Sequence, residues 1–558
     1  MSEGENTAAS WYEATRVASP ERPRLNFDLD FDVCVIGAGL AGLTVAREVA
    51  RRGWSVAVLE ANRVAWAASG RNTGFVLPGF QEDIDSMVER IGLDHTKQLW
   101  ALSEQGLDYV RRTIHETGMP GVDPVPGWLH ISKTDNDDEI RSEVERLRWI
   151  GANVEAWPTE RVREVLPNQR YFSALHFPGA IHIHPLNYAL GLAADAEKFG
   201  ARIFEDTPAL AVDPAGVRKR IDTPGARVRA AHVVLACNVQ LGDLMPRLGA
   251  TLLPITTYVL VTEPIGPVLH EVVRYRGAVS DTNRADNHYR IVGGENSGGE
   301  RLQWSGRMRA WQADPRWVRR GLIADVRRNF PDLGKVEIAH LWRGTLGRAI
   351  HRMPQIGEIE SGLWVASGFG GHGLNTTAMG GELIARGIVE ADPTWRLFAP
   401  YELVWAGGVL GRVLAQGIYW GTRPIERIEQ GLARYRERAR TRRRGRLAVR
   451  AGGSAGRQRP ATPRSTVPRA TRRPAGLTGG FRQPSAPPIL STCGTVLGLR
   501  SNETVDLTFH RLWPRRCRAG AGRLRQYRRG EWHVWRRAGA AEDRLGSGFR
   551  GGPRSGGD

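Results

Sequence analysis

The segment 31–72 contains the feature that most limits the fold of this chain. An apolar run, Phe31–Ile36, leads into the glycine-rich turn Gly37–Gly42 (GAGLAG) and a helical stretch, and a second apolar run ends at Glu60. This strand–turn–helix–strand order, with an acidic residue after the second strand, is typical of dinucleotide-binding α/β folds. The sequence therefore predicts a Rossmann-like sheet that begins near residue 31.

Each residue type in the turn has a physical reason. Gly37 permits the tight turn, Gly39 lets the backbone approach a diphosphate, and Gly42 lets helix and strand pack closely. The N-terminus of the helix presents free N–H groups and a partial positive charge to phosphates. Glu60 is placed to accept hydrogen bonds from a ribose diol. NAD and FAD share this pattern, and an ordinary glycine turn is the alternative.

A second loop of small residues, Ala67–Gly74 (AASGRNTG), follows soon after Glu60. Such a loop suits a long cofactor, because it can pass beneath a flavin ring while the first loop holds the diphosphate. Taken alone, the same segment is equally consistent with a polar surface turn.

The net charge of +19 is concentrated at one end of the chain. Residues 437–558 contain 28 arginines, no lysine and 7 acidic residues, whereas residues 1–436 have a net charge of −2. Arginines interspersed with Trp513, Trp532 and Trp535 are compatible with nucleic-acid binding. Arginine without lysine is unusual for a basic patch, however, and favours a non-functional extension. The composition of 441–558, rich in Arg, Gly, Pro and Ala, predicts disorder.

Four cysteines give no disulfide framework, and the polar N-terminus lacks the apolar core of a secretion signal, so we expect a cytoplasmic protein. No run of about 18 apolar residues predicts a transmembrane helix. The most apolar late segment, Leu403–Trp420, is interrupted by Arg412 and Gln416. We interpret it as a packed helix, with membrane contact as the alternative.

The remaining pattern predicts two domains of mixed α/β type, α+β overall. Helical periodicity over 94–115 and 138–150 alternates with short strands, and residues 252–292 carry strand patterns typical of an antiparallel sheet. The expected division is a discontinuous cofactor domain (27–95, 165–250, 340–395), a mainly antiparallel substrate domain (96–164, 251–339), a C-terminal helical segment (396–440) and a basic tail (441–558).

Several motifs together resemble one family. They are the turn Gly37–Gly42, SGRNTG at 69–74, HIHPLN at 182–187, GFGGHG at 368–373, and the shorter segments Ser10–Tyr12, Trp342–Gly344 and Met353–Gly357. In this order they resemble the D-amino acid oxidase-like FAD-dependent oxidoreductases, and within them the members that oxidise gamma-glutamylputrescine. The resemblance covers about 10–436 and stops where the basic tail begins.

The resemblance implies a set of FAD contacts. The expected cofactor-binding residues are Gly37, Ala38, Gly39, Gly42, Glu60, Ala61, Ser69, Gly70, Arg71, Asn72, Ala209, Gly370, Gly371, Gly373, Leu374 and Asn375. The last five open a helix, whose N–H groups and dipole can stabilise negative charge on reduced flavin.

Two departures from the family pattern refine this expectation. Some members attach FAD to a cysteine shortly before the GFGGHG-like loop, but 342–369 contains no cysteine, and 67–74 contains neither His nor Cys. We therefore expect non-covalent FAD. Members that bind a substrate carboxylate place a lysine just after that loop, where this chain has Asn375. This favours an amine without a nearby carboxylate.

The implied reaction is oxidation of an amine C–N bond by hydride transfer to flavin N5, imine hydrolysis and reoxidation by dioxygen with H2O2 release. This scheme needs no dedicated acid or base, so His372 and Arg71 are expected only as helpers. A backbone-bonded loop histidine and an ion-paired arginine are the respective alternatives. Tyr258 and Arg343 are candidate substrate residues, although core packing is the commoner use of a tyrosine.

Other interpretations stay open at this point. No third metal ligand accompanies His182 and His184, so a structural role is preferred for both and no metal is expected. The leading hypothesis is an amine oxidase acting on gamma-glutamylputrescine or a similar amine. The alternatives are a dehydrogenase for an N-methyl amino acid and an RNA-binding flavoprotein that uses the basic tail. The sequence does not fix the oligomeric state.

Overall fold

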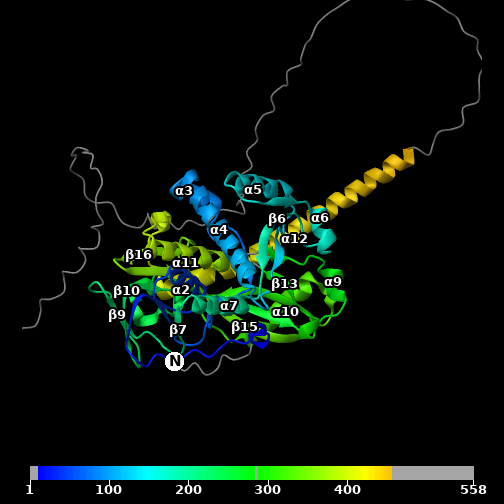
Figure 1. The fold of residues 1–558 in the computed structure, drawn as a ribbon. Helices are drawn as coiled ribbons and strands as arrows, with labels where there is room; N and C mark the ends of the chain where they lie inside the picture. The colour runs from blue at the N-terminus through cyan, green and yellow to red at the C-terminus, as the bar shows by residue number, and fades with distance from the viewer. Residues whose placement is uncertain (1–9, 283–286, 455–558) are drawn as a thin grey trace, which may run out of the picture. The chain divides into compact units, whose positions relative to one another are not determined.

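The computed structural model describes residues 10–282 and 287–454, whose helices and strands are drawn in colour in Figure 1. Two mixed sheets organise the described part of the chain. Most of the sequence predicted to be a disordered tail, 455–558, lies outside the described residues. The last helix, α12 (Gly408–Ser454), continues through 441–454, where the sequence predicts that the tail begins.

The first sheet has eight strands and is built around the predicted nucleotide-binding unit. Its main path is β16 (Gln355–Glu360), β17 (Leu363–Ser367), β10 (Arg227–Leu235), β1 (Leu29–Ile36), β2 (Val56–Leu59) and β7 (Arg202–Phe204), with β8 (Ala211–Asp213) and β9 (Lys219–Asp222) at the side of β10. The strands β17, β10, β1, β2 and β7 run parallel, as the Rossmann-like prediction requires.

Both faces of the first sheet are covered, which explains why its strands are almost continuously apolar. Val33 and Val35 of β1 belong to a core shared with the helices α2 and α11, whereas Cys34 and Ile36 belong to a separate cluster on the opposite face. The pleat of the strand produces this alternation. The helices α2 and α11 contact each other on the same face of the sheet.

The second sheet has nine strands and is mainly antiparallel. Its path is β15 (Ile338–Arg348), β11 (Leu253–Thr262), β14 (Gly299–Arg309), β13 (His288–Gly294), β12 (Ala278–Asp281), β4 (Val125–Ile131), β6 (Ala174–His182) and β3 (Phe75–Val76), with β5 (Glu155–Trp157) beside β6. One pair, β12 and β4, runs parallel. The strands β3, β6 and β15 fall in ranges expected for the cofactor domain, and they pair in this sheet.

The second sheet separates two environments. On one face Tyr258, Tyr289 and Trp304 pack with Val318 and Leu322 of a helix that covers the sheet. Alternation along the strands puts Trp128, His130 and His288 on the opposite face, because Leu129 and Tyr289 belong to the first face. That opposite face also holds most of the polar side chains considered below.

The helices that connect these strands are α1 (Trp11–Ala14), α2 (Leu40–Arg51), α3 (Ile84–Ile91), α4 (Leu93–Thr117), α5 (Asp137–Trp149), α6 (Thr159–Val165), α7 (Pro185–Lys198), α8 (Pro246–Gly249), α9 (Val268–Val272), α10 (Pro315–Asn329) and α11 (Gly373–Val389). Short 3₁₀ turns occupy η1 (Ala68–Gly70), η2 (Asn238–Leu244), η3 (Glu295–Ser297), η4 (Pro331–Leu333) and η5 (Pro393–Phe398). The helices expected at 94–115 and 138–150 correspond to α4 and α5.

Candidate functional site: a dinucleotide cradle and a histidine cluster

The turn between β1 and α2 admits only glycine at two positions. Gly37 has φ +106°, and a Cβ on Gly42 would lie 2.0 Å from the carbonyl oxygen of Gly37. A Cβ on Gly39 would lie 2.9 Å from the hydroxyl oxygen of Ser69. The turn is therefore a cradle that side chains would fill, as the approach of a diphosphate requires.

The N-terminus of α2 is joined to the second predicted loop. Gly39 is the N-cap and contributes no side-chain hydrogen bond, while the backbone N–H of Leu40 donates to the Ser69 hydroxyl at 3.0 Å. The two small-residue loops are thus in direct contact, and the partial positive charge of the helix points to their junction. This arrangement fits the diphosphate of FAD.

Glu60 closes the cradle from the end of β2. Its carboxylate accepts hydrogen bonds from the backbone N–H groups of Ala38 (2.8 Å) and Asn62 (2.9 Å). Burial raises the pKa of Glu60, these bonds and one from Ala61 lower it, and the nearby charge of Glu205 raises it. Glu60 is held beside the glycine turn in a position that suits a ribose diol.

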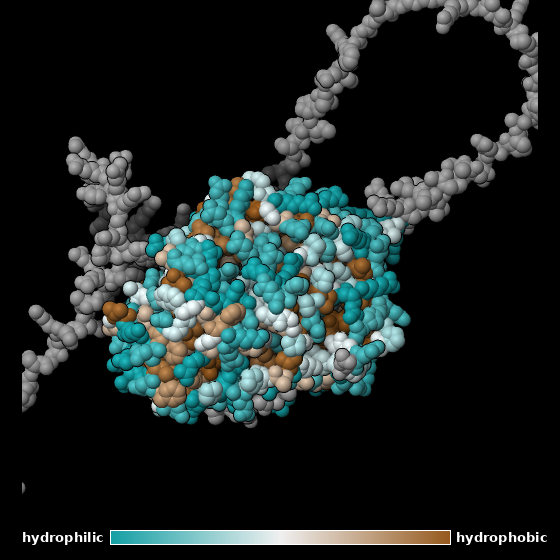
Figure 2. All heavy atoms as spheres, in the orientation of Figure 1, coloured by the Kyte–Doolittle hydropathy of each residue, from teal (hydrophilic) through white to brown (hydrophobic). Residues whose placement is uncertain are grey.

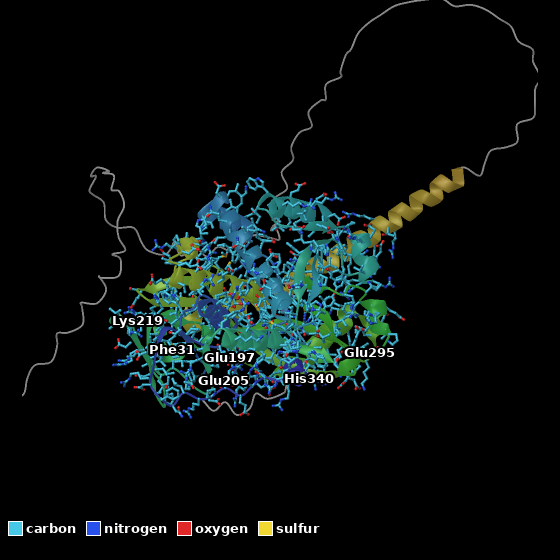
Figure 3. All side chains as sticks on the ribbon, in the orientation of Figure 1. Phe31, Glu197, Glu205, Lys219, Glu295 and His340 are labelled. Atoms are coloured by element: carbon cyan, nitrogen blue, oxygen red, sulfur yellow. The ribbon has the colours of Figure 1, made fainter. Side chains whose placement is uncertain are left out.

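Glu205, just after β7, organises the neighbouring surface (Figure 3). Its carboxylate accepts from the backbone N–H of Val64 at 2.8 Å and pairs with Arg63 at 3.0 Å. Arg22 bridges Glu205 and Glu197, at 3.9 and 2.7 Å. Further along, Ala209 is half-buried before β8 and packs against the core on the second face of the first sheet. This position agrees with an adenine contact, which stays a prediction.

The second loop, Ser69–Gly74, is tightly internally bonded. A Cβ on Gly70 would lie 2.4 Å from the carbonyl oxygen of Ala65. The Asn72 amide donates to the carbonyl of Ser69 at 2.8 Å and accepts from the N–H of Gly74 at 2.8 Å. Because these residues are fixed by their own contacts, the loop forms a preformed floor rather than a mobile surface turn.

Arg71 points back along this loop. Its Nε donates to the carbonyl of Trp66 at 3.0 Å, and its own carbonyl accepts from the indole N–H of Trp342 at 3.0 Å. Burial and the neighbouring charge of Arg343 lower the pKa of Arg71, whereas Glu13 raises it. No described carboxylate forms an ion pair with Arg71, so the arginine of this loop is not the ion-paired residue of the alternative interpretation.

The third predicted segment lies at the start of α11. Gly370 has φ +59°, and the N–H of Gly371 donates to the side-chain oxygen of Gln81 at 3.3 Å. His372 is the N-cap, but its side chain does not cap the helix and is instead hydrogen-bonded to the backbone at Pro78 and Gly79. Leu374 is buried in the core shared with α2. Gly373 is open, since an added Cβ would meet no atom within 4 Å.

Two buried polar atoms at this helix start have no hydrogen-bond partner. They are His372 Nδ1 and Asn375 Oδ1, and the Asn375 amide nitrogen makes only long bonds to the carbonyls of Gly79 (3.3 Å) and Ser103 (3.4 Å). Orphaned buried atoms are uncommon in native proteins and indicate a missing partner. They lie at the helix N-terminus that the sequence predicts to face the flavin, so the residues present fit this end of FAD.

A cluster of three histidines lies at the same place: His130, His288 and His372, which we call the histidine cluster. Burial lowers the pKa of each, to about 4 for His130 and His288. The rings influence one another, and the charge of Asp281 partly offsets the effect on the first two. His130 and His288 are therefore neutral at pH 7, and burial favours the neutral form of His372 as well.

His130 and Trp128 share one hydrogen-bonding partner, the hydroxyl of Ser280. The Ser280 hydroxyl accepts from the Trp128 indole N–H at 2.8 Å and lies 2.9 Å from His130 Nδ1. The hydroxyl can donate to Nδ1 or accept from it, since it has one proton and two lone pairs. Trp128 packs edge-on against His372, with ring centroids 6.4 Å apart, and Phe75 packs edge-on against His288 at 5.4 Å.

The two expected substrate residues lie elsewhere. Tyr258 and Arg343 are opposite each other in the β11–β15 pairing, and both donate to the carbonyl of Ala313, at 3.3 and 3.2 Å. Tyr258 is fully buried in the core on the α10 side of the second sheet. The structure brings these two residues together, but on the face opposite to the histidine cluster.

Arg290, a buried cation behind the loop Ser69–Gly74, was not predicted from the sequence. Arg290 of β13 donates to His182 Nδ1 (2.8 Å) and to the carbonyl of Ile183 (2.7 Å), and it meets the space beside Gly74. Burial and this cation lower the pKa of His182 to about 3. His184 caps α7 by accepting from the N–H of Asn187 at 3.1 Å. Both histidines thus have structural partners, and the described residues include no metal-binding group of three.

Comparison with known proteins identifies the class. A family model described as FAD dependent oxidoreductase (DAO) matches residues 32–386. The chain belongs to this family, and FAD is its cofactor.

Individual relatives agree with this assignment. The chain is 30% identical over 386 residues to the gamma-glutamylputrescine oxidoreductase of Escherichia coli, covering 68% of this chain and 88% of the relative. It is 29% identical over 402 residues to the probable oxidoreductase OrdL of Haemophilus influenzae, covering 70% and 90%. The glycine oxidase structure from Geobacillus kaustophilus matches with a TM-score of 0.56 at 22% identity, covering 67% of this chain and 98% of that one, and supports the fold alone.

Proposed function

We propose that this chain oxidises a C–N bond of a primary amine, with gamma-glutamylputrescine or a closely similar amine as substrate and dioxygen as electron acceptor. The class of oxidoreductase follows from the family, and members such as the Escherichia coli relative support the amine. FAD, held non-covalently by the two glycine loops and the start of α11, supplies the hydride acceptor.

The observation that carries the proposal is the uncharged histidine cluster beside Asn375. Burial keeps His130 and His288 neutral, with pKa values of about 4. A place that disfavours a charged imidazole also disfavours an ammonium ion, so it selects the neutral amine, whose nitrogen lone pair assists loss of the α-hydrogen. Neutral imidazoles can orient that nitrogen by accepting or donating one hydrogen bond.

Asn375 supports the choice against amino acids. It is fully buried. The resemblance described above places it where carboxylate-binding members of the family have a lysine. An amide carries no charge with which to hold a substrate carboxylate next to the reacting carbon. An amine whose carboxylate lies far from the reacting carbon, as in gamma-glutamylputrescine, does not need a positively charged residue at this position.

The decisive test is anaerobic reduction of the bound flavin by a panel of amines. Gamma-glutamylputrescine should bleach the flavin absorbance fastest, and glycine, sarcosine and proline should be slower by about a hundredfold or more, as expected for a missing charge–charge contact. Admission of air should then release one peroxide per flavin. Preferential bleaching by sarcosine or proline would reject the proposed substrate, and reduction without peroxide would reject dioxygen.

The mode of FAD attachment has a separate test. Acid precipitation of the holoenzyme should leave a colourless pellet and yellow supernatant. Flavin that stays on the washed pellet would show a covalent bond and contradict the proposal.

A further inference from the structure

The C-terminal helix α12 packs against the rest of the protein through its polar side. Gln416 is 2% exposed and accepts a hydrogen bond from the backbone N–H of Ala310 at 3.0 Å, and Tyr419 and Ala433 are also buried. Arg423 and Arg427 line a cavity of about 70 Å³ against α10. Packing of a surface helix normally buries its apolar side, so this orientation needs an explanation.

The apolar side chains of the same helix face outward. Ten of them are 40–77% exposed: Val409, Leu410, Val413, Leu414, Ile418, Trp420, Ile425, Ile428, Leu432 and Tyr435. At 100° per residue they occupy one half of the helix circumference over about 40 Å. We call these ten residues the outer face of α12. The expectation of a packed helix over 403–420 is wrong for 403–407, because the helix begins at Gly408, and the rest of the helix packs only through its polar side.

The outer face is extended by the segment that precedes the helix. Leu403, Val404 and Trp405 of this segment are 41–63% exposed. Trp311, which follows β14, packs edge to face against Trp420 with ring centroids 5.9 Å apart and is also exposed. By contrast, the face of the molecule drawn in Figure 2 is mainly hydrophilic, with hydrophobic patches separated by polar ones. A continuous apolar surface of this length marks an interaction site.

Positive charge borders the outer face at its C-terminal end. Residues 408–442 contain eight arginines and three glutamates. Arg436, Arg438, Arg440 and Arg442 are exposed and follow directly after Tyr435. Arg440 pairs with Asp135 at 2.5 Å. Glu437 lies among these arginines but pairs with Arg163 at 2.5 Å. The exposed border is therefore mainly positive, next to apolar and aromatic side chains.

We propose that the outer face of α12 docks on an anionic membrane surface, with the helix lying in the plane of the interface. Apolar side chains enter the boundary between headgroups and acyl chains, tryptophan and tyrosine lie at headgroup level, and the arginines contact anionic headgroups. The described residues include no helix long and apolar enough to cross a membrane, so the contact is peripheral. This inference is independent of the amine proposed above.

A second copy of the chain explains the face less well. A helical seam between copies needs uninterrupted helices and charges of opposite sign along its borders. Here Pro424 lies inside α12, and Gly417 and Gly421 lie on the exposed side. The exposed charges at the end of the face are arginines, because Glu437 is paired with Arg163. Anionic lipid complements this charge, whereas another copy of the same face does not.

The test is co-sedimentation of the full-length holoenzyme with vesicles of phosphatidylcholine alone or mixed with phosphatidylglycerol. The protein should bind the anionic vesicles, and the triple variant L414Q/I418Q/I428Q should bind at least about tenfold more weakly, because apolar burial contributes to the affinity. The variant leaves every charge, including those of the basic tail, in place.

The control replaces three apolar residues outside α12 that are at least 60% exposed, W149Q/L210Q/V217Q, and should bind as the unchanged protein does. Flavin absorbance and circular dichroism confirm that both variants fold. Equal binding of the α12 variant and the unchanged protein would overturn the proposal in favour of the basic tail alone. Absence of vesicle binding, with a dimer in sedimentation equilibrium that the α12 variant abolishes, would overturn it in favour of a second copy.

Discussion

The N-termini of α2 and α11 serve the two ends of one cofactor, yet they are built in opposite ways. At α2 the backbone is crowded, and Glu60 and Ser69 accept the nearby N–H groups at 2.8–3.0 Å. At α11 the loop is open around Gly373, and two buried polar atoms have no partner. A diphosphate site requires that side chains be excluded from the turn. The start of α11 instead keeps unpaired polar groups available for the flavin end of the cofactor.

The strongest test of this contrast is Gly42→Ala. Its Cβ would lie 2.0 Å from the carbonyl oxygen of Gly37, so the turn between β1 and α2 must open. We expect the purified variant to lack FAD and the apoprotein to lose about 3 kcal/mol of unfolding free energy, measured by urea denaturation. A variant that retained stoichiometric flavin would show that the close approach of strand and helix is not required.

A smaller effect is expected for Glu60→Gln. The substitution removes the charge and one of two acceptor oxygens that bind Ala38 and Asn62. FAD affinity should fall by about five- to thirtyfold, equivalent to 1–2 kcal/mol, in fluorescence titration of the apoprotein. The control is Glu358→Gln in β16, which also loses a carboxylate acceptor of a backbone N–H, that of Gly362 at 2.8 Å, away from the cradle. Equal effects of both variants would remove the special role of Glu60.

The histidine cluster predicts a pH dependence at the α11 end. In the unfolded chain His288 takes up a proton near its ordinary pKa of 6.5, whereas burial lowers the folded pKa to about 4. The unfolded state therefore binds more protons between these values, so stability is full above pH 6.5 and falls as pH decreases towards 4. His288→Asn should reduce this fall by about 1–3 kcal/mol, measured by urea denaturation at pH 7 and 4.5. An unchanged slope would contradict a neutral, buried His288.

The smallest effect is expected for Gly373→Ala, the counterpart of Gly42→Ala. Its Cβ meets nothing within 4 Å, and alanine favours the helix. The apoprotein should unfold within about 1 kcal/mol of the unchanged protein, or be slightly more stable. A loss as large as that of Gly42→Ala would show that the two helix ends are equally crowded and would break the comparison.

Much of the α2 end could be predicted from the sequence because its determinants are local. The glycines, the helix and Glu60 lie within 24 residues, and the spacing alone specifies their geometry. The GFGGHG loop was predicted for a related reason, since it follows an apolar strand and opens a helix. The mixed α/β class, with a second and mainly antiparallel sheet, follows from the same periodic patterns.

The histidine cluster could not be predicted in this way. It depends on β12 pairing in parallel with β4, which places Ser280 beside His130, and on β13 adding His288 from a third segment. Such pairings between distant strands leave no signal in local periodicity. Tyr258 and Arg343 were expected at the site but lie on the opposite face of the sheet. The sequence indicates the strand but not which of its residues face the site, because a shift of one residue along a strand moves a side chain to the other face.

The central position of β1 has a consequence for biosynthesis. Its neighbours in the first sheet are β2, which emerges from the ribosome soon afterwards, and β10, which begins at Arg227. The strand β17 and the start of α11 are made only after residue 363. A nascent chain released before that point has one end of the cofactor site and lacks the other, so both ends can hold FAD only after β17 and the start of α11 have been synthesised.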